Sequence, residues 1–463
     1  MQITFRHFLA QKSITALFIF WFLLFPFDAQ VLPVSIGIMT IYPALILTFI
    51  LLLCTLFAKK TQIIDFADKI IMLFFFIWCI YGIAYLPIVK EKTYALYDIR
   101  SLIMMAVTIS MLFLTRYVMG KKHFFAISYQ LSVFVFITLT SFALFEFFTG
   151  IHFKGKFTEL LWNLPVENIT YAPLFLYDNP NTFLCYLFGF ALLIFITQDK
   201  KQNFKNNLLI IAVLLFFSII GDSQSGKLSA CLLFVSNTIH FIITDKYYII
   251  KKYYAWFLLS TGFILFCLFT KEIYFGPIWK NGEHYLINSI NLAKTDKDTI
   301  RFYPADSLLK NFSEEDIIKS YRTYQSHNKD KSINVRINLI KNGLFLTQQS
   351  NFLGVGPGQF MWYHDNHKVP HPTGTINSVH NGPIEILSQY GLLIFIPYLI
   401  LFLYYWFKKI KSDKFNLNAL INTTVIYIVF VLISCMSSAF LILNIGWMLT
   451  AFLLLSSSTE KNV

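Results

Sequence analysis

The sequence predicts an all-α polytopic membrane protein of about twelve transmembrane helices with one large extracytoplasmic loop domain. Of its 463 residues, 56% are hydrophobic and only 14% are charged, whereas a soluble domain carries about 25% charged residues. Long apolar runs recur between polar breaks, and a run of about 20 such residues spans a bilayer as a helix. The runs are too long and too uniformly apolar for barrel strands, so only helices satisfy their backbone groups in lipid. This composition excludes a soluble globular enzyme, a disordered chain and a collagen-like fibre.

The expected spans follow the apolar runs in chain order. They group into residues 1–270, with nine helices and short loops, residues 271–382, a polar loop domain, and residues 383–463, with three helices and a cytoplasmic tail. The twelve predicted spans are 13–27, 34–57, 69–88, 100–118, 124–148, 181–198, 207–221, 228–243, 255–270, 383–407, 417–436 and 438–456.

The distribution of lysine and arginine predicts the orientation of these spans. With the N-terminus in the cytoplasm, the inner segments hold 19 Lys and Arg residues and the five short outer loops hold 6. Cytoplasmic loops carry such an excess, so we expect both termini inside. Most of the net charge of +13 is then a topology signal at the membrane surface, which argues against a nucleic-acid partner.

The six cysteines and the N-terminus give no sign of processing or cross-linking. Each cysteine lies inside an apolar run, as in LLLCTLF around Cys54, and is expected to be a small buried hydrophobic residue. No disulfide framework is expected. No small-residue cleavage site follows Arg6, Lys12 and the first apolar run, so we expect an uncleaved first helix.

The outer segment 271–382 breaks the pattern of short loops. It is too long for a simple connector, and it contains alternating charges (KTDKD, SEED) and the turn GVGPG. We expect a small extracytoplasmic domain with a helix from Ser332 to about Lys341.

The stretch SVHNGPIEIL at the end of this segment carries the clearest candidate for chemistry. Gly382 suits a helix cap, Pro383 the first helical position and Glu385 the third. His380 and Asn381 then directly precede a helix N-terminus, where free N–H groups and the helix dipole favour a bound phosphate and a neutral imidazole. A neutral histidine beside a phosphate suits a general base. The alternative is an ordinary polar loop residue before a span.

A second stretch, residues 334–360, carries an arginine and a glycine-rich turn. Apolar residues at helical spacing (Ile333, Ile337, Ile340 and Leu344) leave Arg336 on the polar flank of a predicted helix. Arginine is always charged and binds phosphate in a fork geometry. The turn GVGPG fits either a structural turn or a phosphate cradle.

Together these stretches resemble the O-antigen ligase and O-antigen polymerase family of bacterial membrane glycosyltransferases. The family pattern is an Arg-bearing helix, a GxGPGxF-like turn and an H-N/S-x-x-x-E-x-L-x-x-x-G segment opening a span. The matching residues here are Arg336, Gly354, Gly356, Pro357, Gly358, Phe360, His380, Asn381, Glu385, Leu387 and Gly391.

Two upstream segments also resemble the family. The N-P-N segment is present as Asn179-Pro180-Asn181 at the sixth span. The segment SQSGK before the eighth span stands in the place of a family S-R/K-S/G segment, but it has Gln224 where a basic residue is common and Lys227 three residues later.

The resemblance implies a GT-C-like fold and a reaction on a lipid carrier. Such enzymes pass a glycan from undecaprenyl diphosphate to an acceptor hydroxyl without a cofactor or metal. By this resemblance His380 is the base, and Glu385 either orients His380 or favours the helix dipole. Arg336 holds the diphosphate, with Arg100 and Lys227 as further candidates, although Arg100 also fits a snorkelling interfacial anchor. The expected supporting residues are Asn381, Asn179, Asn181, Gly356 and Gly358.

Three functions are open, and the first is preferred. The first is an O-antigen or capsular polysaccharide polymerase in the bacterial inner membrane, with its site facing the periplasm, a glycan acceptor and a chain-length regulator as a possible partner. The second is a ligase that moves the polymer to lipid A–core. The third is a transporter or flippase of lipid-linked glycans, but charges such as Glu146 and Asp222 fall at span ends rather than at mid-membrane, which favours an enzyme.

The segment HDNHKVPH contains His364, His367 and His371. Three histidines at this spacing fit a metal site, or a flexible polar or sugar-binding loop. The proline and the absence of a pattern of supporting residues favour the loop, and no metal site is predicted.

Overall fold

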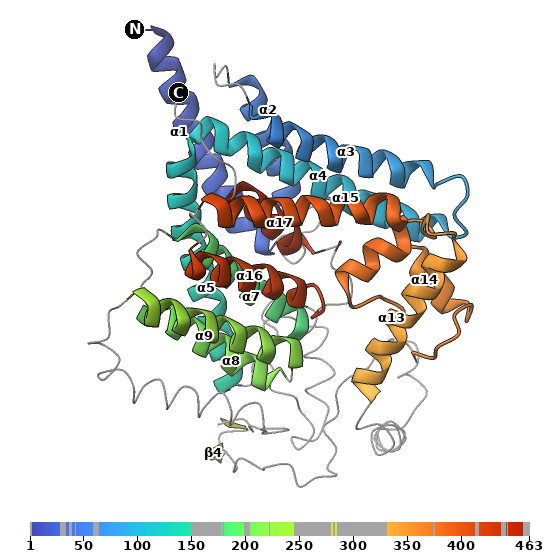
Figure 1. The fold of residues 1–463 in the computed structure, drawn as a ribbon. Coiled ribbons are helices and arrows are strands. Elements are labelled where there is room, and N and C mark those ends of the chain that lie inside the picture. The colour runs from blue at the N-terminus through green and yellow to red at the C-terminus, as the bar shows by residue number, and fades with distance from the viewer. Residues whose placement is uncertain are drawn as a thin grey trace.

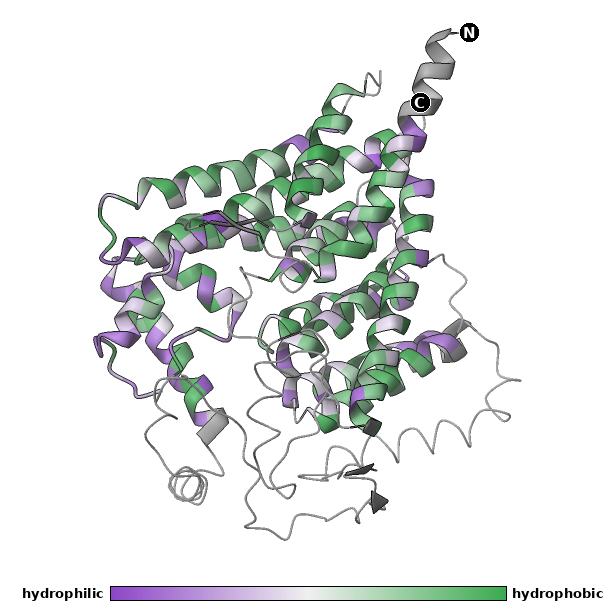
Figure 2. Cartoon of the chain, turned by 180° about the vertical axis from the view of Figure 1, so that it is seen from behind, coloured by the Kyte–Doolittle hydropathy of each residue, from purple (hydrophilic) through white to green (hydrophobic). Residues whose placement is uncertain are grey.

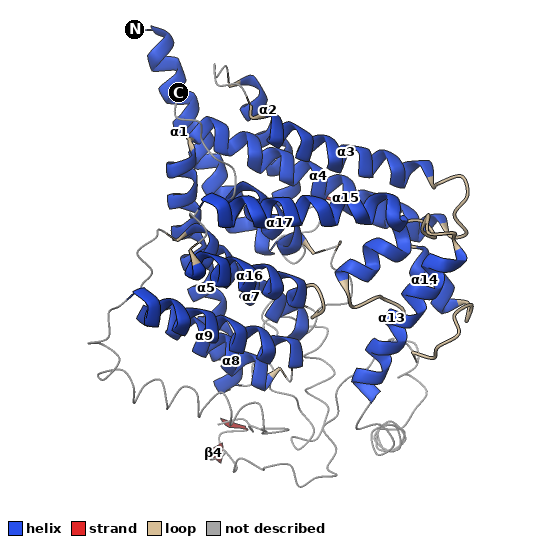
Figure 3. Ribbon diagram, in the orientation of Figure 1, coloured by secondary structure: helices blue, strands red, loops and turns tan. Residues whose placement is uncertain are grey.

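The computed structural model describes residues 2–27, 34–36, 39–41, 43–58, 64–149, 177, 180–198, 204–221, 223–244, 279–280, 283–284, 331–373, 376–412, 416–436, 441 and 443–456. Helices dominate this part of the chain (Figures 1 and 3). They are α1 (Gln2–Leu24), η1 (Phe25–Phe27), α2 (Pro43–Phe57), α3 (Phe66–Ala84), α4 (Lys92–Met119), α5 (Lys121–Thr149), α7 (Pro180–Thr197), α8 (Phe204–Ile220), α9 (Gln224–Thr244), α13 (Lys331–Gln349), α14 (Gln359–Asp365), α15 (Gly382–Ser412), α16 (Leu417–Ile433) and α17 (Asn444–Ser456).

The helical, multi-pass membrane character predicted from the sequence is confirmed. Among the described residues, α3, α4, α5 and α15 are long and apolar enough to cross a bilayer, and six shorter apolar helices accompany them. Eleven of the twelve predicted spans fall on helices. The predicted span 255–270 lies outside the described residues, so the number twelve stays a prediction, as does a separate loop domain.

Three predicted spans differ from the helices observed. The span 34–57 begins with an antiparallel hairpin of β1 (Val34–Ile36) and β2 (Met39–Ile41), and its helix starts at Pro43, where proline suits the first helical position. The span 100–118 belongs to the longer α4, whose start is capped by the Glu91 side chain, 2.9 Å from the Thr93 N–H. The span 383–407 is interrupted at Gly391. A second hairpin pairs β3 (Trp279–Lys280) with β4 (Glu283–His284).

Hydrophobic residues cover most of the bundle, and hydrophilic residues gather at α13 and α14 (Figure 2). Aromatic side chains fill the interior, as where Trp21 packs on Phe25 with ring centroids 4.5 Å apart. Large apolar side chains such as Phe57 and Phe66 are exposed on the outside of the helices. A soluble protein rarely exposes so many, so these surfaces face lipid.

A buried ion pair ties α3 to α4 at the end of the bundle opposite α13 and α14. The Arg116 guanidinium lies 2.8 Å from the Asp68 carboxylate, which also accepts a 2.7 Å hydrogen bond from the Tyr117 hydroxyl. Asp68 is 0% and Arg116 4% exposed. Arg116 is one of the 19 Lys and Arg residues of the inner segments that were interpreted as topology signals at the membrane surface. The structure instead buries its side chain, which pairs with Asp68.

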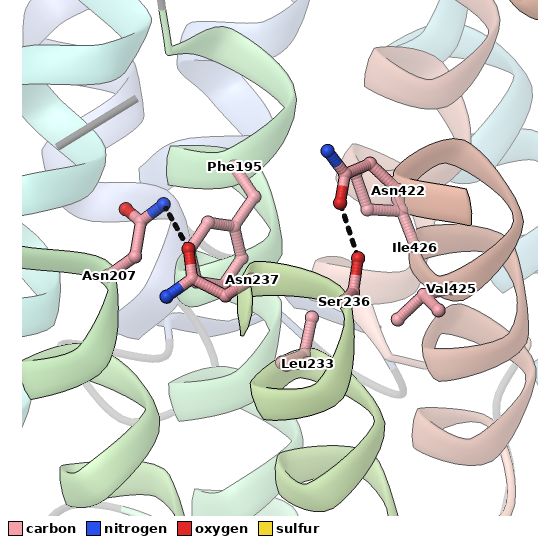
Figure 4. A pocket seen from close by; sticks show the side chains of 8 residues that line it. All are labelled: Phe195, Asn207, Leu233, Ser236, Asn237, Asn422, Val425 and Ile426. Carbon is pink, nitrogen blue, oxygen red and sulfur yellow. Dashed lines mark hydrogen bonds between the residues drawn. The ribbon is translucent and has the colours of Figure 1, made fainter. Parts of the chain in front are cut away.

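A small pocket of about 30 Å³, lined by both polar and apolar side chains, lies between α7, α8, α9 and α16 (Figure 4). Ser236 donates a hydrogen bond to Asn422, and Asn207 donates to Asn237 at 3.2 Å. This volume holds a water molecule but no sugar. The pairing of Ser236 with Asn422 also sets the register in which α9 lies against α16.

Candidate functional site

The site is assembled where α13 crosses the first segment of α15 (Figure 1). The Cβ position of Gly343 on α13 lies 2.3 Å from Ile384 of α15, so only glycine permits this close crossing. Between α13 and α14, the GVGPG turn folds back onto α15 where that helix is interrupted. Gly391 there has φ 67° and ψ −172°, a conformation that only glycine adopts easily.

His380 stands directly before α15 in an unusual backbone conformation, with φ 50°. Non-glycine residues in this left-handed region are uncommon and gather at functional sites. Its Nδ1 atom is buried and has no hydrogen-bond partner in the described part of the chain. The ring as a whole is half-buried, so Nε2 is the nitrogen left open to a ligand.

The electrostatic surroundings keep His380 neutral. Burial and the positive charge of Arg336 together lower the pKa of His380 from its ordinary 6.5 to about 4. The imidazole is therefore unprotonated at neutral pH, which is the state that a general base requires. The sequence-based expectation of a neutral histidine thus has two physical causes here, burial and Arg336.

Arg336 lies on the inward face of α13 and not on the flank predicted from hydrophobic spacing. Leu339 and Leu346 are fully buried, whereas Ile337 and Leu344 are exposed. Arg336 precedes Leu339 by three residues, so both share one face of the helix. The half-buried guanidinium makes no ion pair or hydrogen bond with any described residue, and its charge reaches His380.

The first turn of α15 is already saturated with hydrogen bonds. The Asn381 side chain accepts from the Ile384 N–H at 3.1 Å, and the Asn381 carbonyl accepts from the Glu385 N–H at 2.8 Å. The Gly382 N–H donates to the Ser434 carbonyl at 3.3 Å. The predicted free N–H groups at this helix end are therefore occupied, and Asn381 rather than Gly382 provides the cap.

Two backbone donors remain just before the helix. The N–H groups of His380 and Asn381 make no hydrogen bond within the described residues. The charge of Arg336 acts on the first of these residues, His380. A guanidinium and free backbone N–H groups are a donor set typical of anion binding.

Glu385 is buried in the first turn of α15. Its carboxylate accepts from the Leu441 N–H at 3.4 Å, and no hydrogen bond joins it to His380. Of the two predicted roles, direct orientation of the imidazole has no support in this geometry, whereas a place in the first turn of α15 does.

The GVGPG turn is structural, because its backbone donors are occupied. The Val355 and Gly356 N–H groups donate to the carbonyls of Ser388 and Gln389, each at 2.9 Å. The Gly358 N–H lies 2.8 Å from the Asp98 carboxylate, and the Gln389 side chain accepts from the same group. Gly356 and Gly358, with φ 100° and 69°, therefore support the site by shaping this turn and do not cradle a phosphate.

Asp98 is a residue that the sequence interpretation missed. It is buried on α4, and its carboxylate holds the GVGPG turn through Gly358. Gln389, which accepts from the same Gly358 N–H, lies near the end of the first α15 segment. The acidic side chain two residues before Arg100 was the available signal, because a buried carboxylate near the start of a span requires a partner. Asp98 thus connects α4 to the GVGPG turn, which itself bonds to α15 at Ser388 and Gln389.

Within the described part of the chain, Arg100 and Asn181 make no contact with Arg336 or His380. The guanidinium of Arg100 lies 4.8 Å from the centroid of the Tyr97 ring, and this ring is exposed, which fits an interfacial anchor. Asn181 is half-buried in the first turn of α7. Asn179 lies outside the described residues.

Lys227 lies at the same end of the bundle as His380. Ser236 on α9 pairs with Asn422 on α16, and Leu233 shares a cavity with Val425 and Ile426, so the two helices run antiparallel. In this register Lys227 is level with the last turn of α16, and the next residue after that helix, Ser434, bonds to Gly382. Lys227 itself is buried.

The three histidines of HDNHKVPH do not converge. His364 is buried on α14, with Nδ1 3.1 Å from the Thr373 hydroxyl. Thr373 donates its own proton to the Ile376 carbonyl, so it accepts from Nδ1 of a neutral His364. Burial lowers the pKa of His364 to about 4. No three His, Cys, Asp or Glu side chains among the described residues are close enough to hold a metal ion.

Comparison with known proteins gives two matches. Residues 181–399 match the family model described as O-antigen ligase. The chain is also similar to the teichuronic acid biosynthesis protein TuaE of Bacillus subtilis (strain 168), with 24% identity over 375 residues, which are 78% of this chain and 66% of that protein. The chain therefore spans just under two thirds of the length of this relative. The resemblance that the motifs predicted is thus confirmed: over residues 181–399 this chain matches the O-antigen ligase family.

Proposed function

We propose that this chain is a membrane glycosyltransferase that polymerises an O-antigen or capsular polysaccharide. It transfers a glycan from undecaprenyl diphosphate to the hydroxyl of an acceptor glycan at the outer face of the inner membrane, with its site facing the periplasm. The observation that carries this proposal is a neutral His380 beside the charge of Arg336, which makes no ion pair with any described residue. The family match and the name of the relative support a role in polysaccharide biosynthesis.

In the proposed reaction, His380 and Arg336 act on opposite sides of one displacement. His380 Nε2 takes the proton of the acceptor hydroxyl, and the oxygen forms a bond to the anomeric carbon of the donor glycan. The bond from that carbon to the diphosphate oxygen breaks, and undecaprenyl diphosphate leaves with the electron pair. Arg336 and the N–H groups of His380 and Asn381 stabilise the negative charge that develops there.

Further groups support this pair in the proposal. Lys227, level with the last turn of α16, supplies a second positive charge on the donor side. Asn381 caps α15 and so holds the His380 backbone in place. We propose no metal or cofactor, because diphosphate is already a good leaving group.

The family description favours a second function, ligation of the finished polymer to lipid A–core. Surface glycans and lipid-linked intermediates of a strain that lacks the protein distinguish the two. Single repeat units on the carrier lipid in place of a ladder support the polymerase. Long chains that stay on undecaprenyl diphosphate, with no surface polymer, support the ligase. Unchanged fractions of both kinds contradict both.

Replacement of Arg336 tests the diphosphate contact. Arg336→Gln is expected to reduce transfer by about 10²–10³-fold, the usual effect of losing one donor to transition-state charge. Arg336→Lys keeps the charge but not the fork geometry, and we expect it to remain impaired. Initial rates of transfer from a purified lipid-linked donor provide the measurement, with membrane insertion of each variant as control. Full activity of Arg336→Lys shows that charge alone suffices.

The pH profile tests the cause of the neutral imidazole. The base must be unprotonated, so transfer should be lost only as pH falls through about 4, well below the ordinary 6.5. Arg336→Gln removes one of the two causes of the lowered pKa, and the acid limb of its residual activity should move to higher pH. An acid limb near 6.5 in the unaltered protein contradicts the buried environment of His380.

A further inference from the structure

The connection between α16 and α17 is tied to the first turn of α15 at two points. The Ser434 carbonyl accepts the Gly382 N–H at 3.3 Å, immediately after α16 ends. Further along, the buried Leu441 donates its N–H to the Glu385 carboxylate, and its carbonyl accepts from the Trp447 indole at 2.7 Å. These bonds fix the described ends of the connection against the helix start that follows His380.

The turn Ser434–Met436 is itself rigid. The Cys435 and Met436 N–H groups donate to the carbonyls of Leu432 and Ile433, both at 3.0 Å. Met436 is fully buried, whereas Cys435 is half-buried. The Cys435 thiol donates to the Val431 carbonyl at 3.4 Å, and Cys435 is the member of this turn whose side chain is only half-buried.

We infer that the turn Ser434–Met436 forms one wall of the Arg336–His380 site, beside α13 and the start of α15. In this arrangement the Cys435 side chain borders the anion-binding space in front of Arg336. The Ser434–Gly382 hydrogen bond places residue 435 beside the start of α15. The pKa of Cys435 supports this placement: burial raises it, and the charge of Arg336 acts in the opposite direction. The inference rests on the proposed function, because it names which side of the site the donor diphosphate occupies.

This arrangement assigns a positioning role to Glu385. Its carboxylate holds Leu441 and so anchors the far end of the connection, away from His380. The buried carboxylate thus holds a residue of the connection that begins with the turn Ser434–Met436.

Charged thiol reagents test the placement of Cys435 without any need for activity. The full-length protein is labelled with an anionic (sulfonatoethyl) or a cationic (trimethylammonioethyl) methanethiosulfonate, and Cys435→Ser provides the blank. The anionic reagent should be favoured, and Arg336→Gln should reduce the anionic-to-cationic rate ratio by roughly threefold or more, the effect of one charge at short range in a wet site. Inorganic pyrophosphate should slow labelling in the unaltered protein and not in Arg336→Gln. A ratio that is the same with and without Arg336 overturns the inference.

A matched pair of variants tests the same wall through the reaction. Cys435→Glu places a carboxylate beside Arg336 and should raise the KM for the lipid-linked donor at least tenfold relative to Cys435→Gln, which has the same shape without the charge. The kcat values of the two variants should be similar. Equal KM values overturn the inference. Glycan transfer at an undiminished rate in Arg336→Gln overturns the proposed function instead, whatever the labelling result, so the two failures are distinguishable.

Discussion

His380→Ala is expected to abolish measurable glycan transfer while the protein still inserts and accumulates in the membrane. A positioned general base contributes about 10²–10⁴-fold to a rate, and Nε2 of His380 is the open nitrogen beside Arg336. The measurement is the single-turnover rate of transfer from a purified lipid-linked donor, together with the amount of protein in the membrane. Normal transfer at normal expression removes His380 from the mechanism.

The backbone conformation of His380 supplies a matched control. With φ 50°, position 380 favours residues that tolerate the left-handed region, and asparagine does so better than alanine. His380→Asn therefore keeps the local backbone and a polar side chain but removes the base. If His380→Asn is as inactive as His380→Ala, the loss belongs to the base. If His380→Asn recovers activity, the loss in His380→Ala belongs to the backbone.

Asp68→Leu is expected to destabilise the bundle by about 3–5 kcal/mol, the usual effect of leaving one partner of a buried ion pair alone. Asp68 and Arg116 are 0% and 4% exposed and lie 2.8 Å apart. Without Asp68, the guanidinium of Arg116 stays buried beside an apolar side chain. The measurement is the thermal unfolding temperature of the purified protein in detergent.

The double variant Asp68→Leu with Arg116→Met provides the control. It removes both charges, and replacement of a buried ion pair by apolar residues of similar size is often neutral or stabilising. We expect it to recover most of the stability lost in Asp68→Leu. A double variant that is less stable than Asp68→Leu contradicts this account, and so does an Asp68→Leu protein as stable as the unaltered one.

Eleven of the predicted spans and the two stretches that carry Arg336 and His380 could be located from the sequence, because both depend on local patterns. Apolar runs are read directly as membrane helices, and the order of Arg336, the glycine-rich turn and His380 was sufficient to indicate the family. The neutral state of His380 was also predicted. Its causes include the charge of Arg336, whose approach to His380 depends on the packing of α13 against α15.

The face of α13 was predicted wrongly for a physical reason. In a soluble protein the apolar stripe of a helix marks its buried side, so Ile337 and Leu344 suggested an inward face that excluded Arg336. α13 is not one of the described helices that are apolar enough to cross a bilayer, and it has apolar residues on more than one face. Ile337 and Leu344 are exposed, whereas Leu339 and Leu346 are buried on the side that carries Arg336. Hydrophobic spacing alone cannot identify the inner face of such a helix.

The remaining differences depend on contacts between distant parts of the chain. The Asp98 carboxylate bonds to Gly358, 260 residues away, and no local pattern indicates this partner. The interruption of α15 at Gly391 depends on the strand-like contact in which the Leu392 N–H donates to the Phe352 carbonyl at 2.8 Å. The hydrogen bond from the Leu441 N–H to the Glu385 carboxylate likewise depends on a distant part of the chain, the connection after α16.

The glycines of the GVGPG turn set different limits on how related sequences can diverge. A Cβ at Gly358 would lie 2.4 Å from the main-chain carbonyl of Tyr94, whereas a Cβ at Gly356 would meet the side chains of Val89 and Tyr85 at 2.9 and 3.0 Å. Smaller residues at 85 and 89 would relieve the crowding at position 356, but its φ of 100° disfavours any side chain there. No side-chain replacement at position 94 makes room for position 358. We therefore expect homologues that retain this start of α4 to keep glycine at both positions, at 358 for want of space and at 356 because of its backbone conformation.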